Sequence, residues 1–556
     1  MLSENQLKYI EQLKKHKETP RKLSEILKAE TNKNIVKTQG IVFTPIELVD
    51  YIFKDMLDIS EWQNKKIVDI AVGNGVFLIG LLINLKEQNP TLNLRQIVEN
   101  NLYGYDLEKV NVEYTNLNLK LLLEYYGENT DKLKLNIEQA NSLEKFKNKK
   151  GEFDIILGNP PYVKQQNLTI DQRKYLEENF KTINSNFNLS YAFLETIVNL
   201  LKPNGIAIQV VPNNLLKLKS ASTLREYLIQ NKVLDSIVDF DKYKIFKDIG
   251  TYTMVLKLSK KDNKELKYKK IEEQPDYTKI LKMPWQKTTT ISKDSIDLIS
   301  KEEEKIIEAV ENNYYKLITA TGISTQNNFL YLVEKDKSGY YKEYNGIKYK
   351  IDAKSIKPIY KCSMQNKNAL NKEYIIYPYE NGKIKSEEIL KTTEPNTYKY
   401  LLAIKKELYK RSGIEENEKY WYKYGRSQAI NNFQEKIIYP MTSKEPNFIH
   451  IKEEALYYNG NAILEVKGKD KSLDLETAEL ILNSEIIEKY VACKSHCISG
   501  GYYNYNKKVI SKITIPEITE EQKLRLQSED KEEVIKEIYF SNKNSYWGWS
   551  KWLQKN

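Results

Sequence analysis

Residues Lys66–Leu82 read KIVDIAVGNGVFLIGLL, an apolar segment that leads through two glycines into a second apolar segment. The first part, Ile67–Ala71, has the composition of a buried strand, and the residues after Gly75 have helical spacing. Glycines between a strand and a helix let the backbone approach a ligand, and the helix start offers N–H groups to a carboxylate or phosphate. The stretch therefore predicts a strand, a glycine loop and an amphipathic helix at a ligand site.

Strand-like and helix-like segments alternate outward from this stretch, between residue 41 and about residue 259. This alternation predicts a doubly wound, Rossmann-like α/β sheet. A dinucleotide-binding loop would have a third glycine where Leu78 stands, which disfavours a nicotinamide cofactor. The further strand-like segments are Leu102–Asp106, Asp154–Gly158, Ile206–Pro212, Val233–Phe240 and Tyr252–Ser259.

The 556 residues exceed the size of one hydrophobic core, and changes in composition divide them into four regions. Residues 1–40 alternate basic and apolar residues and predict a helical arm. Residues 41–262 contain the α/β alternation. A polar stretch predicts a linker over 263–285. Residues 286–556 are rich in Tyr, Lys and Asn without βα rhythm, and predict an irregular, mixed α+β domain.

The composition limits the chemistry. There are 87 Lys and Arg against 76 Asp and Glu, and the net charge of +11 is compatible with a polyanionic partner. Three histidines and three cysteines leave little material for a disulfide scaffold or a histidine relay. Cys493, His496 and Cys497 supply only three ligands, so no metal site is expected. Without a signal-like or membrane-spanning apolar run, we expect a cytoplasmic protein that does not insert into membranes.

The segment Phe153–Val163, FDIILGNPPYV, indicates the chemistry most directly. A strand ends at Gly158, and two prolines then make the backbone rigid. The side-chain oxygen of Asn159 and the carbonyl of Pro160 are placed to accept hydrogen bonds from one exocyclic amino group, while Tyr162 offers a stacking face to a planar base. Such a holder prepares an amine to attack a sulfonium methyl group without a histidine.

An acidic residue, Asp106, ends the strand-like segment LYGYD. A carboxylate at this position is suited to accept hydrogen bonds from both ribose hydroxyls of an adenosine-like cofactor. A turn aspartate that caps the following helix explains the residue equally well.

Together, Thr44-Pro45, the Asp69–Phe77 loop, Asp106 and Asn159–Tyr162 resemble the gamma-class N6-adenine DNA methyltransferases, the Taq-type enzymes. In that family an S-adenosylmethionine-binding domain precedes a C-terminal target-recognition domain, and the order of motifs matches. The resemblance extends through residues 38–260 and is patchy over 310–520. It implies a methyltransferase sheet followed by a DNA-recognition domain.

The resemblance also implies roles for single residues. Asp69 faces the cofactor's amino group, Asp106 binds its ribose, and Asn141 stands where the family often has an Asp for the cofactor adenine. Phe246 would lie against the far face of the target base. Thr44 would touch the methionine part of the cofactor, although Thr44, Pro45 and Glu47 also predict a helix cap. The predicted cofactor-binding residues are Thr44, Asp69, Ala71, Gly73, Asp106 and Asn141.

Two patches of the C-terminal half combine aromatic and basic residues, as nucleic-acid surfaces do, and they are Tyr420–Pro440 and Leu482–Ile515. Both resemble recognition-domain segments, as does Leu317–Leu332. A folded core with a solvated basic rim is the alternative interpretation. The predicted DNA-binding residues are Trp421, Tyr424, Arg426, Gln428, Gly501, Tyr502, Tyr505 and Lys507.

The sequence therefore predicts a site-specific adenine methyltransferase of the EC 2.1.1.72 type, which acts on double-stranded DNA after base flipping. Asn159, Pro160 and Tyr162 are the predicted catalytic residues, Tyr162 and Phe246 the stacking pair, and S-adenosylmethionine the cofactor. We expect a monomer, with a separately encoded restriction endonuclease as a possible partner. N4-cytosine methylation and a DNA-binding specificity subunit without turnover remain as alternatives; glutamine methyltransferases, which share the tetrapeptide, are much shorter.

Overall fold

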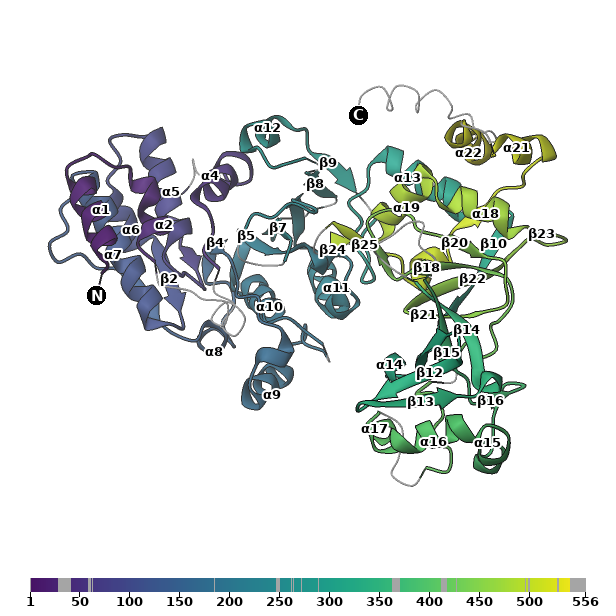
Figure 1. Cartoon of the computed structure of the whole chain (residues 1–556). Helices are drawn as coiled ribbons and strands as arrows, with labels where there is room; N and C mark the ends of the chain where they lie inside the picture. Colours follow the sequence, from purple (N-terminus) through teal and green to yellow (C-terminus); the bar gives the residue numbers. More distant parts are fainter. Residues whose placement is uncertain are drawn as a thin grey trace. The chain divides into compact units, whose positions relative to one another are not determined.

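The chain forms two compact units in the computed structural model, shown from one side in Figure 1. The first comprises Met1–Ser300 and Cys497–Gly500, and the second comprises Lys301–His496 and Gly501–Asn556. The structure describes residues 2–28, 42–58, 62, 64–184, 186–246, 251–261, 263, 265–271, 273–288, 290–362, 371–411, 418–426, 428–495, 497–498, 501–527 and 530–540.

The first unit is built on a nine-stranded sheet. Its strands are β1 (Ile67–Asp69), β2 (Leu102–Asp106), β3 (Asn136–Gln139), β4 (Phe153–Gly158), β5 (Leu201–Pro212), β6 (Leu234–Asp239), β7 (Thr253–Ser259), β8 (Leu266–Lys270) and β9 (Gln286–Thr288). Their order is β3-β2-β1-β4-β5-β7-β6-β8-β9. The first five strands pair in parallel, whereas β7 runs antiparallel to β5 and β6. The predicted doubly wound α/β sheet is therefore confirmed.

Helices cover both faces of this sheet. They are α1 (Glu4–Lys14), α2 (Leu23–Ile26), α4 (Ile46–Asp55), α5 (Val76–Gln88), α6 (Leu94–Asn100), α7 (Lys109–Tyr125), α8 (Ser142–Lys145), α9 (Ile170–Asn179), α10 (Ser190–Leu200), α11 (Ser222–Gln230) and α12 (Tyr277–Lys282), with 3₁₀ turns η1 (Pro20–Lys22), η2 (Gln165–Asn167), η3 (Asn213–Leu216) and η4 (Lys219–Ala221). Alternate residues of β4 enter different cores, Ile155 and Leu157 on one face and Ile156 on the other. Burial on both faces explains why its sequence is continuously apolar.

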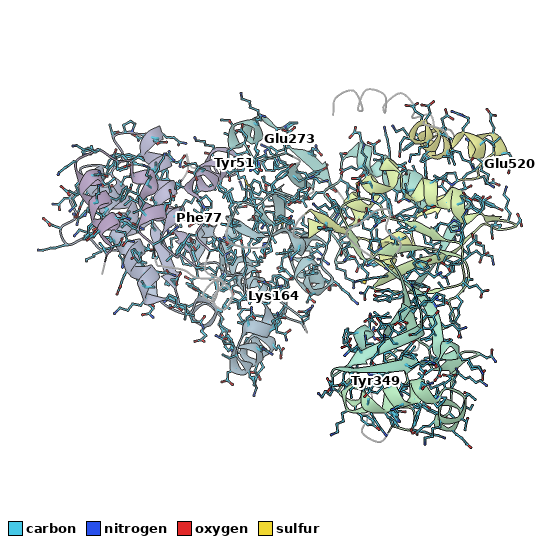
Figure 2. All side chains as sticks on the ribbon, in the orientation of Figure 1. Tyr51, Phe77, Lys164, Glu273, Tyr349 and Glu520 are labelled. Carbon is cyan, nitrogen blue, oxygen red and sulfur yellow. The ribbon has the colours of Figure 1, made fainter. Side chains whose placement is uncertain are left out.

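The helix after the glycine loop differs from its prediction. We expected an amphipathic helix, but α5 is buried on all sides from Val76 to Leu85. The reason is close packing against α4, because a Cβ added at Gly80 would lie 2.5 Å from Val49 Cγ1. Figure 2 shows the surrounding side chains, with Phe77 of α5 and Tyr51 of α4 both buried.

The N-terminal arm packs against the first unit as far as residue 28, and residues 29–41 lie outside the described chain. Tyr9, Leu13, Leu23 and Leu27 belong to the same core as α5 and α7. Arg21 pairs with Asp50 of α4 and, at 2.7 Å, with Glu87 of α5. The predicted arm is thus an integral part of this unit.

The linker predicted over 263–285 is wrong, because this segment contains β8 and α12, and β9 follows it in the same sheet. The segment resembles a linker in sequence because three of the five residues of β8 are lysines. Lys269 is 1% exposed, and its Nζ donates to Asp55 Oδ2 at 2.8 Å and to the Ile280 carbonyl at 2.9 Å. The first unit consequently continues to Ser300.

The second unit is mixed α+β, as predicted, but more regular than its sequence indicated. Its strands are β10 (Tyr315–Thr321), β11 (Leu332–Asp336), β12 (Gly339–Tyr344), β13 (Ile347–Ile351), β14 (Ile356–Lys361), β15 (Asn371–Ile376), β16 (Tyr379–Glu380), β17 (Lys383–Ile384), β18 (Lys436–Pro440), β19 (Thr442–Ser443), β20 (Ile449–Ile451), β21 (Leu456–Tyr458), β22 (Gly460–Lys467), β23 (Ser472–Leu473), β25 (Tyr502–Asn504) and β26 (Thr514–Ile515). The two largest sheets have the orders β20-β18-β22-β10-β26 and β13-β12-β11-β15-β14-β21.

Each of these two sheets packs with its own helices and core. The helices of the unit are α13 (Lys301–Glu311), α14 (Asn328–Tyr331), α15 (Glu387–Thr393), α16 (Pro395–Ala403), α17 (Lys405–Tyr409), α18 (Leu475–Leu482), α19 (Glu485–Lys494), α20 (Lys507–Ile510), α21 (Glu520–Arg525) and α22 (Lys531–Phe540). Antiparallel pairing over long chain separations, such as β10 with β22, explains why no βα rhythm is visible in the sequence.

Replacing Lys269 tests the structural role of the segment taken for a linker. Lys269→Ala should lower the free energy of unfolding by about 3 kcal/mol, because it leaves the carboxylate of Asp55 without its buried cation. Lys267→Ala, at an exposed position of the same strand, should change it by less than about 0.5 kcal/mol. Urea unfolding measures both. Equal stability of the two variants would contradict the buried pairing.

Candidate functional site

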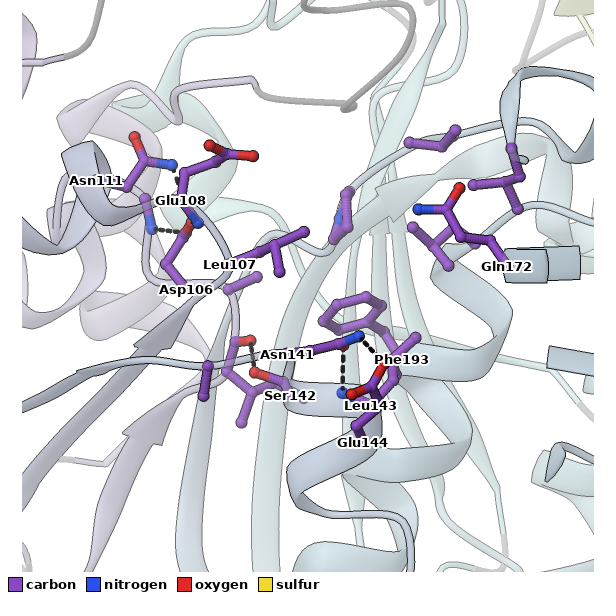
Figure 3. A pocket seen from close by; sticks show the side chains of 18 of the residues that line it. Asp106, Leu107, Glu108, Asn111, Asn141, Ser142, Leu143, Glu144, Gln172 and Phe193 are labelled. Carbon is purple, nitrogen blue, oxygen red and sulfur yellow. Dashed lines mark hydrogen bonds between the residues drawn. The ribbon is translucent and has the colours of Figure 1, made fainter. Parts of the chain in front are cut away.

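A cavity of about 600 Å³ lies at the carboxyl ends of β1, β2 and β4 (Figure 3). The strand order reverses here, between β2-β1 and β4-β5, which is where ligands bind in open α/β sheets. The lining includes four of the six predicted cofactor residues, Ala71, Gly73, Asp106 and Asn141. Thr44 and Asp69 do not line it, but each hydrogen-bonds to a residue that does.

Asp106 anchors one side of the cavity, as Figure 3 shows. Its carboxylate accepts hydrogen bonds from the backbone N–H of Gly73 at 2.9 Å, the N–H of Glu108 at 2.9 Å and Nδ2 of Asn111 at 3.0 Å. Burial raises the pKa of Asp106, and the three donors oppose that rise. The residue therefore ties the glycine loop to the start of α7 and still faces the cavity with its remaining acceptor capacity.

Asp69 ends β1 beneath this loop and is 1% exposed. Its Oδ1 accepts a hydrogen bond from the backbone N–H of Ala71 at 2.9 Å. Burial, with a smaller contribution from the negative charge of Asp106, raises the pKa of Asp69 to about 8. A Cβ added at Gly158 would lie 2.7 Å from Asp69 Oδ1, so the end of β4 needs a glycine beside this carboxyl group.

Asn141 lines the cavity as the N-cap of α8. Its Oδ1 accepts a hydrogen bond from the N–H of Leu143 at 3.2 Å, and its Nδ2 donates to Glu144 Oε1 at 2.7 Å, as Figure 3 shows. The neighbouring Ser142 hydroxyl donates to the Ile70 carbonyl at 2.6 Å. The amide is thus oriented by its own helix at the edge of the cavity.

Asn159 is the most informative residue of the site. Its Nδ2 donates to the Val42 carbonyl and to Thr44 Oγ1, both at 3.2 Å. Its Oδ1 is buried and has no hydrogen-bond partner among the described residues. Because an unsatisfied buried acceptor costs free energy, such an atom points to a missing donor. Thr44 takes part in this arrangement, whereas the predicted helix cap is wrong because α4 begins after Pro45 with no side-chain cap.

Tyr162 and Phe246 belong to the same core region. The Tyr162 hydroxyl donates to the Val210 carbonyl at 2.9 Å, and burial raises its pKa well above the usual value. Phe246 is 5% exposed. Neither side chain lines the described cavity, and their stacking role stays a prediction.

One face of α7 supports the cavity from behind. Thr115 Oγ1 donates to the Gly73 carbonyl at 2.8 Å, and Asn118 Nδ2 donates to the carbonyls of Asn74 and Leu27 at 2.9 and 3.0 Å. With Asn111, these residues recur at the i, i+4 and i+7 positions that share a helix face. The helix thereby fixes both the glycine loop and the N-terminal arm.

Sequence reasoning missed several lining residues. Phe43 precedes the recognised Thr44-Pro45 pair, and Asn111 lies in the first turn of α7, five residues after Asp106. Four apolar residues from the segment after the Asn-Pro-Pro-Tyr turn form another wall, Leu168, Leu176, Leu189 and Phe193. The first two had a detectable signal in their spacing from known motifs. The apolar wall had none, because core and cavity residues have the same composition.

The predicted DNA-binding residues separate into two groups. Trp421, Tyr424 and Tyr505 are at most 2% exposed and pack in cores of the second unit. Their rings are therefore unavailable to a nucleic acid in this conformation. We no longer propose these three residues as DNA contacts. Arg426, Gln428 and Lys507 are exposed, whereas Gly501 and Tyr502 are partly exposed.

The chain is similar in sequence to restriction-modification methyltransferases. Residues 100–246 match the model of the Eco57I restriction-modification methylase family. The chain is 24% identical to the Type II restriction enzyme and methyltransferase RM.Eco57I of Escherichia coli, over 86% of this chain and 57% of that protein. It is 22% identical to the Type II methyltransferase M.BanIII of Aneurinibacillus aneurinilyticus, over 91% and 94% of the respective chains. The chain thus spans little more than half the length of RM.Eco57I.

A solved structure supports the fold of both units. The Type IIL restriction-modification enzyme MmeI, solved in complex with DNA, superposes over 91% of this chain and 72% of its own, with a TM-score of 0.58 and 13% identity. The predicted fold class, an α/β sheet followed by an additional mixed α+β domain, is confirmed by this likeness.

Two features are absent from the described residues. No helix there is long and apolar enough to span a membrane. No group of three or more His, Cys, Asp and Glu side chains there is arranged to hold a metal ion.

The buried carboxyl group of Asp69 predicts a pH-dependent stability. In the folded protein the Asp69 carboxyl group keeps its proton up to about pH 8, whereas in the unfolded chain it loses the proton near pH 4. The free energy of unfolding should therefore fall as the pH rises through this window. Asp69→Asn should remove this dependence and be more stable than the wild type above pH 8, by on the order of a few kcal/mol. Urea unfolding at pH 5, 7 and 8.5 measures the difference, and parallel pH profiles would contradict it.

Proposed function

We propose that this chain is a site-specific DNA methyltransferase that uses S-adenosylmethionine to methylate N6 of an adenine flipped out of duplex DNA. The observation that carries the proposal is the buried, unpartnered Oδ1 of Asn159 at the carboxyl end of β4. The methyltransferase relatives and the family match support it independently.

The residues present fit the cofactor. A cavity of about 600 Å³ has room for a nucleoside ligand, and drug-sized ligands occupy cavities of this class. The carboxylate of Asp106 suits a ribose. An ammonium group of the cofactor beside Asp69 would lower the pKa of this carboxyl group and so favour its charged form. Asn141 would meet the adenine through its amide, in place of the Asp common in the resembling family. Thr44, Ala71 and Gly73 would complete the set.

The proposed chemistry depends on position and electrostatics. When bound, S-adenosylmethionine supplies a sulfonium methyl group that a nitrogen lone pair can attack. Asn159 Oδ1 and the Pro160 carbonyl would accept hydrogen bonds from the target amine, which orients its lone pair and stabilises the positive charge that develops on it. Tyr162, and Phe246 on the other side, would clasp the extruded base. Hydrogen bonds from Asn159 Nδ2 to Val42 and Thr44 hold the acceptor in place.

The partners follow from this reaction. Double-stranded DNA is the proposed substrate, with its sequence read by the second unit. A separately encoded restriction endonuclease would be a functional partner, whereas the relative RM.Eco57I is named as both a restriction enzyme and a methyltransferase. We propose that the methyltransferase acts as a monomer.

Substitution of Asn159 tests the mechanism. Asn159→Ala should reduce the rate of methyl transfer by about 100-fold or more, the loss expected when a positioned polar group at the reacting atom is removed. Affinity for S-adenosylmethionine, measured by calorimetry, should be nearly unchanged. Asn231→Ala, at an exposed position of the same unit, should retain full activity. An Asn159→Ala enzyme with wild-type turnover would refute the proposed role.

The methyl acceptor distinguishes adenine from the alternatives. We expect tritium from labelled S-adenosylmethionine to appear in N6-methyladenine after incubation with duplex DNA and chromatography of the hydrolysed nucleosides. Label in N4-methylcytosine would instead support a cytosine enzyme, because the same tetrapeptide can hold that amine. Specific binding of duplex DNA without any transfer would identify a specificity subunit.

A further inference from the structure

A polar loop in the second unit presents an aromatic side chain to solvent. Phe329, at the end of the sequence Ser324-Thr-Gln-Asn-Asn-Phe329, is 66% exposed. Among the residues that the structure describes, it is the only aromatic residue in the exposed class. Gln326 and Asn327 beside it are also exposed. A single exposed apolar residue needs no explanation by itself. The significance of Phe329 therefore depends on the residues that surround it.

The loop is rigidly supported from the protein interior. Thr325 Oγ1 donates to Asn328 Oδ1 at 2.7 Å and accepts from the N–H of Asn327 at 3.2 Å. Arg411, which is 6% exposed, donates to the Thr325 carbonyl at 3.1 Å and to the Trp421 carbonyl at 3.0 Å. A buried cation thus joins the backbones of the two segments at buried positions, so the exposed side chains that follow in each segment keep a defined geometry.

The second of these segments brings an arginine to the loop. The N–H of Arg426 donates to the Ser324 carbonyl at 3.1 Å within an antiparallel bridge. Gln326 has a φ of 62°, and its side chain lies against Gly425, where an added Cβ would be 2.4 Å from Gln326 Cγ. A larger residue at 425 would displace Gln326. The backbone therefore holds Gln326 and Arg426 next to each other.

A lysine lies behind the aromatic ring. Lys342 of β12 is 6% exposed, and its Nζ is 3.9 Å from the centroid of the Phe329 ring. This cation–π contact orients the ring and adds positive charge at the base of the loop. The surrounding segment 321–361 contains eight lysines and four acidic residues, so the region is complementary to a polyanion.

We infer that Ser324–Phe329 and Arg426 form a reading loop that contacts the edges of base pairs at the recognition site. Amide side chains pair with adenine edges, arginine pairs with guanine, and a phenylalanine ring contacts the methyl group of thymine. The reading loop combines all three kinds of side chain on one rigid support. This inference rests on the proposed DNA methyltransferase function and assigns part of its sequence specificity to named residues.

Three single variants test the reading loop, namely Gln326→Ala, Phe329→Ala and Arg426→Ala. Each should lower the ratio of kcat/KM between the recognised site and sites with one altered base pair by about tenfold or more. Ile347→Ala is the matched control, because Ile347 is 55% exposed on β13, the strand beside β12, which carries Lys342. The control should keep the wild-type ratio. The wild-type site is first identified by sequencing methylated DNA with modified-base detection.

Thermal unfolding separates readout from stability. All four substituted side chains are exposed, so the variants should have the wild-type Tm. The reading loop is refuted if the three variants methylate the same sites with the wild-type ratio. Should the wild type bind a specific duplex without methylating it, the same ratio is measured from affinities. A wild type that neither binds nor methylates DNA would refute the proposed function itself.

Discussion

The parallel pairing of β1 with both β2 and β4 is the constraint on which the site depends. Val68 lies opposite Tyr103 on one side and Ile156 on the other, which brings the three carboxyl ends to one edge. Asp106 at the end of β2 and, in the loops that follow β1 and β4, Gly73 and Asn159 then line a common cavity. A slip of one residue would exchange the side chains that face the two cores, so hydrophobic burial specifies the register and with it the positions of the polar groups.

Polar groups at this edge are held in states that cost stability. Asp69 is buried and accepts a hydrogen bond from the backbone N–H of Ala71, and Asn159 has an unsatisfied oxygen within the described chain. Folded proteins usually pair such groups, and exceptions concentrate at functional sites. The face of α7 that carries Thr115 and Asn118 supplies the support that keeps the loop in this arrangement. Favourable packing and hydrogen bonds elsewhere in the unit thus offset the cost of these polar groups and keep the site in a conformation ready to bind a ligand.

Local patterns predicted the site better than they predicted its surroundings. The strands before Gly73, Asp106 and Asn159 are where the sequence indicated, because buried parallel strands require continuous apolar residues. In the segment 263–285 strand β8 was not predicted, because it is rich in lysine. The tertiary structure buries Lys269, which donates to Asp55 and to the Ile280 carbonyl. Trp421 looked like a DNA-contacting residue but packs in a core, because aromatic residues serve both purposes equally well.

The sequence by itself determined the α/β alternation, the glycine loop and the Asn-Pro-Pro-Tyr turn, because each depends on residues adjacent in the chain. Only the tertiary structure decided that Asn159 donates to Val42 and Thr44 and leaves its oxygen unpartnered. Likewise, it decided that Phe329, and not Trp421, is exposed. The physical reason is that burial and hydrogen bonding are set by contacts between distant segments, which no local pattern encodes.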